Sequence, residues 1–440
     1  MQHYFNSLAD HVNGRLQGEE RFLMNFGAED SDFVRLNHAQ VRQAGSVRQR
    51  IVSIDLIAGQ RHAPGMVCLS GDAELDRDRL SRLVEELRGK LAFLPEDPYL
   101  LYSTDVRSTE HHAENQLLPA HEAVAQIQDA AKGLDLVGLY ASGGIHSGFA
   151  NSFGQRNWFS SYSFNFDFSA YHHGDKAVKA DYAGFRWDPA GFAAKMSSVR
   201  EQFSYLTREA RTIKPGHYRV YLAPAAVWDL MSTLAWGGFG LKDHRTKQTT
   251  LIRMTEEGAK LHPTITLMEN VKEGVAAAFN GAGFIKPDQT TIIERGAFKN
   301  CLASARSAKE YGVPTNGASE AETPDSLDLA AGEIPREEIL SRLGTGLYVN
   351  NLHYLNYSDR PACRMTGMTR FATFWVENGS IAAPVNVMRF DETIYRVLGE
   401  NLIGLTRERD FVLDSQTYFA RSTSSQRVPG ALVEGFHFTL

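Results

Sequence analysis

The stretch SYSFNFDFSAY, Ser161–Tyr171, alternates aromatic and polar residues and decides the fold of its half of the chain. Tyr162, Phe164, Phe166 and Phe168 share one parity, and serine, asparagine and aspartate occupy the other. Successive side chains of a strand point to opposite faces of a sheet, so the pattern predicts a strand with one core face and one polar face. Core packing explains the aromatic face more simply than a ligand platform does.

The flanking segments extend this strand into an α+β domain. The segment LVGLYASGGIHSGFANSFG, Leu136–Gly154, supplies a second strand and a turn rich in Gly, Asn and Ser, so we expect an antiparallel pair. A further half-buried strand is expected over 50–58, where apolar residues alternate with polar ones. The segment Trp187–Leu206 predicts a long helix with Asp188 as its N-cap and Pro189 at its first position.

The pattern of apolar residues changes near RTIKPGHY, Arg211–Tyr218, where Pro and Gly end the helical periodicity. Short apolar runs separated by turns follow, which is typical of β structure. We therefore predict an α+β protein with two domains. The amino-terminal domain, 1–212, carries helices on a mainly antiparallel sheet, and the carboxy-terminal domain, 213–440, is β-rich and either barrel-like or a sandwich.

Two stretches of the second half carry local predictions. Asn378 and Gly379 form the dipeptide preferred in tight two-residue hairpin turns. The stretch NGASEAETPDSLDLAAGEIPREE, Asn316–Glu338, is acidic and rich in small residues and Pro, so we expect a surface excursion or mobile loop there.

Composition narrows the classes of function. The 440 residues are 43% hydrophobic and 22% charged, and no apolar run is long enough to cross a bilayer. The net charge of -6, without a long basic block, argues against nucleic acid as a ligand. The three cysteines, Cys68, Cys301 and Cys363, are scattered and form no CxxC pair, so reduced thiols are expected. Because the sequence shows no bilayer-spanning run and no amino terminus resembling a signal peptide, we expect a cytoplasmic location without membrane attachment.

Three stretches carry a resemblance to known proteins: TTIIERGAFKNCLASARSAKEYG, Thr290–Gly312; the stretch GTGLYVNN to GSIAAPV, Gly344–Val385; and, more weakly, SDFVRLNHAQVRQAGSVRQ, Ser31–Gln49. They resemble the TldD/PmbA family, once called modulators of DNA gyrase and now understood as subunits of a zinc-dependent cytoplasmic peptidase. Their order and spacing extend the resemblance through most of the chain. It implies an α+β fold with a β-rich carboxy-terminal domain.

Metal-bearing members of this family place an HExxxH motif on a helix that follows a strand early in the second domain, and a cysteine near the carboxyl end completes the zinc site. The matching segment here, HYRVYLAPAAVWDLMSTLAWGGFG, has Ser232, Thr233 and Gly237 where His, Glu and His are expected. The segment TYFARSTSSQRVPGAL, Thr417–Leu432, matches the cysteine-bearing region and contains no cysteine. Hydroxyl groups alone bind zinc too weakly at neutral pH to replace these ligands.

The resemblance is therefore to the PmbA/TldE-type subunit, which lacks the motif. It implies a chain without a cofactor or catalytic residue of its own that forms the chamber of a peptidase acting on peptides. Zinc would belong to a TldD-type partner in a heterodimer. A homodimer is the other possible assembly, because exposed strand edges need covering.

Other histidine-containing stretches resemble metal sites less convincingly. HEAVAQ, starting at His121 and Glu122, is one residue away from HExxxH, but its position in the first domain and its helical spacing predict an ordinary surface helix. The remaining clusters are EHHAEN, with His111, His112 and Glu114, and YHHGD, with His172, His173 and Asp175. Adjacent strand histidines point to opposite faces, so solvent-facing positions are expected unless the two clusters meet in space.

Two alternative functions remain open at this stage. The first is a hydrolase acting alone, either with unorthodox metal ligands or through Cys363, whose thiolate would be favoured by Arg360 and Arg364 and served by His353 as a base. The competing interpretation is a buried thiol, because the sequence identifies no orienting group and no oxyanion donors. The second alternative is a regulator that binds another protein.

Overall fold

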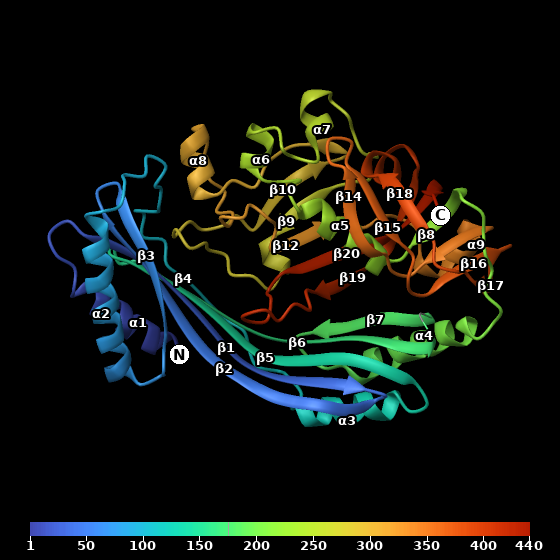
Figure 1. Ribbon diagram of the computed structural model, residues 1–440, viewed down its shortest axis with the longest axis horizontal. Coiled ribbons are helices and arrows are strands. Elements are labelled where there is room, and N and C mark those ends of the chain that lie inside the picture. Colours follow the sequence, from blue (N-terminus) through green and yellow to red (C-terminus); the bar gives the residue numbers. More distant parts are fainter. Residues whose placement is uncertain (175) are drawn as a thin grey trace.

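The computed structural model describes residues 1–174 and 176–440, so the predicted ligand Asp175 lies outside the described residues. Two β-rich parts lie one above the other (Figure 1). The amino-terminal part comprises α1 Gln2–Asn13, β1 Arg21–Asn37, β2 Gln40–Ala58, β3 Arg61–Cys68, α2 Ala73–Leu91, β4 Thr109–His112, α3 Ala120–Ala130, β5 Asp135–Asn151, β6 Arg156–His173, β7 Lys176–Gly184 and α4 Pro189–Leu206. No helix among the described residues is both long enough and apolar enough to span a membrane.

The amino-terminal strands form a curved sheet in the order β3-β2-β1-β5-β6-β4, with β7 also paired to β6. All strand pairs of this sheet are antiparallel except β4 with β6, which is parallel. The predicted antiparallel pairing of β5 with β6 is confirmed. Helices α1 and α2 pack on one end of this sheet, and α3 and α4 pack on the other end. The carboxy-terminal part lies over the opposite face (Figure 1).

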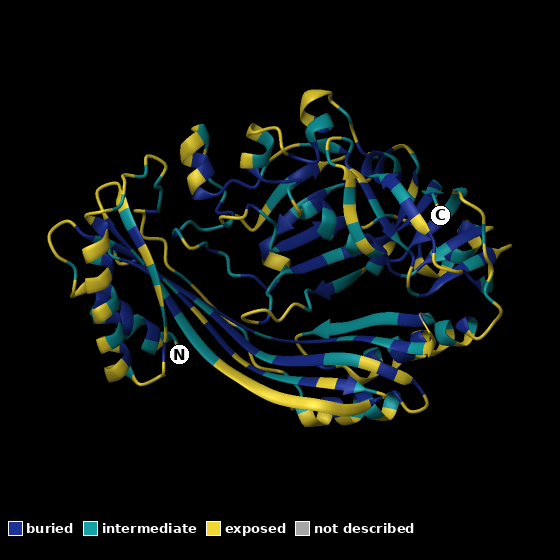
Figure 2. Cartoon of the chain, in the orientation of Figure 1, coloured by how far each residue is buried: buried dark blue, intermediate teal, exposed yellow. Residues whose placement is uncertain are grey.

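The aromatic alternation of β6 produces the expected core face. Phe164, Phe166 and Phe168 are at most 1% exposed and pack with Phe192 of α4. The polar face differs from the prediction, because Ser161, Ser163 and Asn165 are also buried. The carboxy-terminal part lies over this face of β6 (Figure 2). This cover explains why these small polar side chains are inaccessible to solvent.

Local signals set the helix starts as predicted. The Asp188 carboxylate accepts a hydrogen bond from the Ala190 amide at 3.1 Å, and Pro189 opens α4. Such a cap satisfies an amide that has no partner within the helix. HEAVAQ lies in α3, a helix whose apolar residues Ala123, Val124 and Ile127 are buried.

The carboxy-terminal part is built mainly from short strands around β20. Its elements are β8 Gly216–Leu222, α5 Pro224–Ala235, α6 Leu241–Arg245, α7 Ile252–Glu256, β9 Leu267–Asn270, η1 Val271–Glu273, β10 Gln289–Glu294, β11 Ala297–Phe298, α8 Ala305–Tyr311, β12 Ser326–Leu329, η2 Arg336–Glu338, α9 Ile339–Leu343, β13 Gly346–Val349, β14 His353–Asp359, β15 Arg364–Met368, β16 Thr373–Glu377, β17 Ser380–Pro384, β18 Arg389–Thr393, η3 Arg396–Glu400, β19 Leu402–Leu413 and β20 Ser425–Phe438. The structure is thus α+β, as predicted.

The barrel-like alternative for this part is wrong. Its main sheet runs β11-β10-β9-β12-β20-β8-β13-β16-β17, and the end strands β11 and β17 do not pair with each other in the described chain. Strand β20 also pairs with β18 and β19, so the sheet branches instead of closing. The predicted division at 212/213 falls between the end of α4 at Leu206 and the start of β8 at Gly216.

Turn chemistry was easier to predict than burial in this part. Asn378 and Gly379 have φ angles of 50° and 76° and connect β16 to β17, as the tight hairpin requires. The stretch Asn316–Glu338, by contrast, is not simply a surface loop. It contains β12, whose residues are all buried between β9 and β20.

A candidate site that replaces a metal centre

The segment matching the zinc motif lies where a strand leads directly into a helix. Strand β8 lies between β20 and β13, and it ends at Leu222. Pro224 then opens α5, because proline at the first helical position gives up no hydrogen bond. One side of α5 is core, and Trp228 and Ser232 line a groove on the other side.

Ser232 contacts the second segment in which a metal ligand is missing. Its hydroxyl oxygen accepts a hydrogen bond from Nε2 of Gln426 at 2.8 Å. Gln426 lies on β20, in the segment that matches the cysteine-bearing region, and the two residues are 194 positions apart. The two places singled out in the sequence are therefore parts of one site.

This pair lines a groove of about 290 Å³. Trp228 and Trp236 contribute aromatic surface, and Thr323, Gln416 and the Ser232–Gln426 pair contribute hydroxyl and amide groups. Such a lining offers hydrogen bonds and stacking surface but little charge. It is suited to binding uncharged polar groups, including the main chain of a peptide.

Thr233 and Gly237 do not reproduce the geometry of a motif helix. The Thr233 hydroxyl donates to the Asp229 carbonyl at 2.9 Å within α5. Helix α5 ends at Ala235, and Gly237 has a φ angle of 85°, which favours glycine. A Cβ atom at Gly237 would lie 2.5 Å from Nη2 of Arg360.

The donor set does not fit zinc. Zinc sites use imidazole, thiolate or carboxylate groups, usually three from the protein in a catalytic site. Asp414 is the carboxylate among the groove residues, and no group of three His, Cys, Asp or Glu side chains suited to a metal occurs in the part of the chain that the structure describes. No metal-dependent step can be derived for this site.

The description "PmbA/TldA metallopeptidase C-terminal domain" belongs to a family profile that matches residues 215–440, just over half of the chain. The chain belongs to the TldD/PmbA family. Its fold is shared with a proposed modulator of a DNA gyrase from Thermotoga maritima (14% identity, 99% of each chain covered, TM-score 0.75). It is also shared with TldE from Thermococcus kodakarensis (14% identity, 99% of this chain and 100% of that chain covered, TM-score 0.77).

A third similar structure is a proposed modulator of DNA gyrase from Bacteroides thetaiotaomicron (16% identity, 99% of this chain and 98% of that chain covered, TM-score 0.73). No curated protein matches the sequence. At these identities the likeness establishes the fold of this TldD/PmbA family member, and the chemistry has to be argued from its own residues.

The thiol considered as an alternative nucleophile is buried. Burial raises the pKa of Cys363 to about 12, and the Thr250 hydroxyl and Arg360 only partly oppose it. His353 pairs with Met368 at one end of the β14–β15 hairpin, whereas Cys363 lies in the turn at the other end. The structure does not bring this thiol and imidazole together.

The histidine clusters of this family member also stay apart. His111 and His112 lie on β4 beside Phe159 and Ser160, near the start of β6. His172 and His173 lie at the opposite end of β6. The His121 side chain is 84% exposed.

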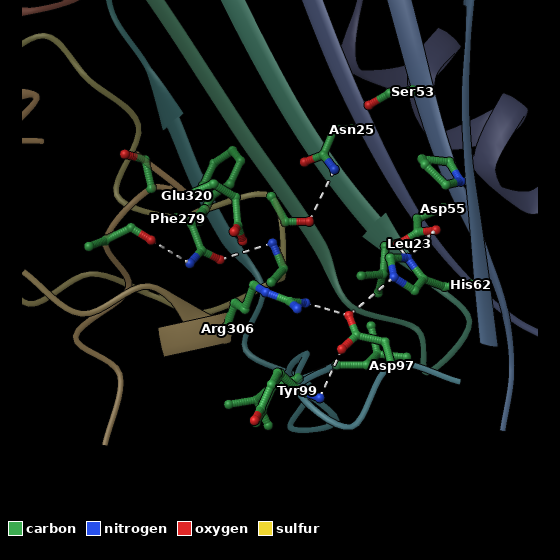
Figure 3. Close-up of a pocket in the computed structure, with 18 of the residues that line it drawn as sticks. Leu23, Asn25, Ser53, Asp55, His62, Asp97, Tyr99, Phe279, Arg306 and Glu320 are labelled. Atoms are coloured by element: carbon green, nitrogen blue, oxygen red, sulfur yellow. Dashed lines mark hydrogen bonds and ion pairs between the residues drawn. The ribbon is translucent and has the colours of Figure 1, made fainter. Parts of the chain in front are cut away.

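A larger cleft of about 550 Å³ lies between the two parts of the protein (Figure 3). His62 bonds Asp55 through Nδ1 at 2.9 Å and lies 3.5 Å from Asp97 through Nε2. Burial favours the neutral form of Asp97, but the Tyr99 amide and Arg306 outweigh it and lower the pKa of this carboxyl group. Because Arg306 comes from α8, this cluster joins the two parts.

Sequence patterns gave no signal for several residues around the site. Gln426 lies in the segment that we had singled out, but its partner Ser232 is remote in sequence. Arg421, in the same segment, is buried and reaches across to the amino-terminal sheet. Neither residue type has a spacing rule that predicts such contacts.

Proposed function

We propose that this chain is a metal-free, PmbA/TldE-like subunit that completes a cytoplasmic peptidase together with a metal-bearing TldD-type subunit. The contact between Ser232 and Gln426 supports the proposal, because it joins the two segments that resemble the family's metal-binding regions through a hydroxyl and an amide. The fold shared with TldE from Thermococcus kodakarensis agrees with this type of subunit. Any zinc of the assembly would then be held by the partner.

In such an assembly the groove would hold substrate without cleaving it. The Ser232 hydroxyl accepts its hydrogen bond from the Gln426 amide, and this amide cannot take up the proton that a nucleophilic serine must lose. The tryptophans and hydroxyl groups can instead contact an extended peptide, whose main chain offers regularly spaced donors and acceptors. The substrate class is therefore unfolded or short peptides.

The first test is to mix the purified chain with a TldD-type protein and measure mass and cleavage of a fluorogenic peptide. We expect a stable complex that cleaves the peptide, while the isolated chain binds no stoichiometric zinc and cleaves nothing. Absence of a complex, or a complex that cleaves no faster than the TldD-type protein alone, rejects the proposal. Cleavage by the isolated chain would also overturn it.

The groove itself can be tested within that complex. Trp236 is 60% exposed in the groove, and Phe93 is an exposed aromatic residue that does not line it. We expect Trp236→Ala to raise KM with little change in kcat, because it removes binding surface and no reacting group. Phe93→Ala should leave both constants unchanged.

A hydrolase acting through Cys363 is less well supported. A nucleophilic cysteine needs access and a thiolate at working pH, and Cys363 has neither. Activity of the isolated chain that is lost on thiol alkylation would revive this alternative.

A further inference from the structure

The candidate groove carries one charged side chain. It lies where α5, the segment leading into β12 and the loop before β20 come together (Figure 1). Among the described residues, its lining includes the carboxylate of Asp414 but no lysine, arginine or histidine. A cleft lined by charge of one sign attracts ligands of the opposite sign. The groove therefore favours a ligand with a positively charged group.

One oxygen of the Asp414 carboxylate is free to receive such a group. Oδ1 accepts a hydrogen bond from the Gln416 amide at 3.1 Å, whereas Oδ2 accepts none and Asp414 forms no ion pair within the described chain. A guanidinium binds best to both oxygens of a carboxylate at once, whereas an ammonium group binds as a point charge. The single free oxygen therefore favours an ammonium ligand over a guanidinium.

Gln426 supplies an unpartnered acceptor in the same groove. The residue is only 8% exposed, and its Nε2 atom donates to Ser232. Its buried Oε1 atom has no hydrogen-bond partner among the described residues. A buried acceptor without a partner costs free energy, so it favours the binding of a donor. An ammonium group has three N–H donors, and Asp414, Gln426 and the Thr323 hydroxyl offer it acceptors in one groove.

The tryptophans of the groove add a second kind of attraction. The face of an indole ring attracts a cation that lies within about 6 Å of its centre. The Arg360 guanidinium already lies 5.6 Å from the centre of the Trp236 ring. No lysine or arginine of the described chain lies over Trp228, which also lines the groove. The Trp228 ring is therefore free to contact a cationic ligand.

We propose that the groove binds a primary ammonium group of a peptide, held by Asp414 and Gln426 and packed against Trp228. Two groups of a peptide have this chemistry, the amino terminus and the lysine side chain. The inference rests on the proposed function in taking a peptide as the ligand, and it adds which part of the peptide the groove recognises. A peptide without an ammonium group keeps only the main-chain and ring contacts.

Titration of the isolated chain with four short peptides at pH 6.5, where both kinds of amine are protonated, tests the inference by ligand-observed NMR. The peptides are tetra-alanine amide with a free amino terminus, its acetylated form, and two acetylated forms that end in lysine or in norleucine. We expect the free amino terminus, the lysine peptide or both to bind at least about tenfold more tightly than the two uncharged peptides. The peptide that binds tightly identifies the source of the ammonium group. Equal affinities for all four peptides, or no binding up to about 5 mM, overturn the inference.

Variants at position 414 test whether its charge is responsible. Asp414→Asn keeps an oxygen for the Gln416 amide and removes the charge, so we expect the preference for the ammonium peptide to fall about tenfold. Asp414→Glu should restore part of the preference. The matched control Asp288→Asn changes the net charge equally at an exposed position outside the groove, and it should keep the wild-type preference. An undiminished preference in Asp414→Asn overturns the inference.

Salt dependence of the wild type gives the same test if Asp414→Asn fails to fold. Between about 50 mM and about 500 mM sodium chloride, the affinity for the ammonium peptide should fall and that for the uncharged peptides should not. The same salt dependence for charged and uncharged peptides contradicts recognition of the ammonium group.

The inference and the proposed function fail in different experiments. Absence of a complex with a TldD-type protein rejects the proposed subunit and leaves the titrations unaffected, because they use the chain alone. Equal affinities in the titrations reject recognition of an ammonium group and leave the subunit role intact.

Discussion

Arg421 donates hydrogen bonds from Nη2 to both the carbonyl and the hydroxyl of Ser163, at 2.9 Å and 2.8 Å. The arginine comes from the loop before β20, and the serine lies on the polar face of β6. Arg421 also donates from Nη1 to the Gly143 carbonyl at 3.2 Å. This one side chain therefore fastens the carboxy-terminal part to the amino-terminal sheet beside the candidate groove.

We expect Arg421→Lys to lower the free energy of unfolding by about 2–4 kcal/mol, because a buried ammonium cannot reach the acceptors that the planar guanidinium satisfies together. Urea unfolding monitored by circular dichroism gives the free energy. Arg407→Lys is the matched control, since Arg407 is exposed. If the two variants have the same free energy of unfolding, the Arg421 side chain does not hold the two parts of the protein together.

Gly237 provides a second test, at the position where the family's motif would place a histidine. Its φ angle of 85° is strained for any other residue, so Gly237→Ala should destabilise the protein by about 1–2 kcal/mol. Gly89 lies within α2 with open space around its Cβ position. Gly89→Ala should therefore stabilise the protein by about 0.5–1 kcal/mol. Thermal melts in which both variants shift the melting temperature in the same direction would contradict this prediction.

Local signals in the sequence predicted the elements whose structure depends on near neighbours. The alternation in β6 predicted its pairing and its aromatic core face, and Asp188 with Pro189 predicted the start of α4. The Asn378–Gly379 turn was predicted for the same reason, since two φ angles decide it. In each case the pattern is complete within a few residues.

Features that depend on remote partners could not be predicted. Strand β12 was expected to be part of a loop because the stretch Asn316–Glu338 is acidic and rich in small residues and Pro, yet Asp328 of this strand is buried between Asn270 and Arg409. No local sequence pattern predicts the burial of a carboxylate whose hydrogen-bonding partners lie on other strands. The same limit applies to the groove, where comparison of motifs located Ser232 but could not supply its contact with Gln426.

Cysteine reactivity tests the burial of Cys363. Cys68 is exposed, and burial raises the pKa of Cys301 to about 11 and that of Cys363 to about 12. At pH 8 we expect Ellman's reagent to modify Cys68 quickly and Cys363 at least about 100-fold more slowly, until the protein unfolds. The variant Cys363→Ser should show the same fast phase, and its loss in that variant would assign the reactive thiol to Cys363.

Asp229 on α5 makes stability depend on pH. Its carboxylate accepts a hydrogen bond from the Leu352 amide at 2.9 Å, but burial outweighs this bond and raises the pKa from 3.8 to about 7. Between about pH 4 and pH 7 the folded protein therefore keeps a proton that the unfolded chain has released, so stability falls as pH rises through this window.

Asp229→Asn removes the ionisation and retains the accepting oxygen. We expect this variant to exceed the wild type by about 1–3 kcal/mol at pH 8 and by much less at pH 4. Asp105→Asn, at an exposed position, should show no such pH-dependent gain in urea unfolding, and an equal gain in both variants would exclude Asp229 as its source.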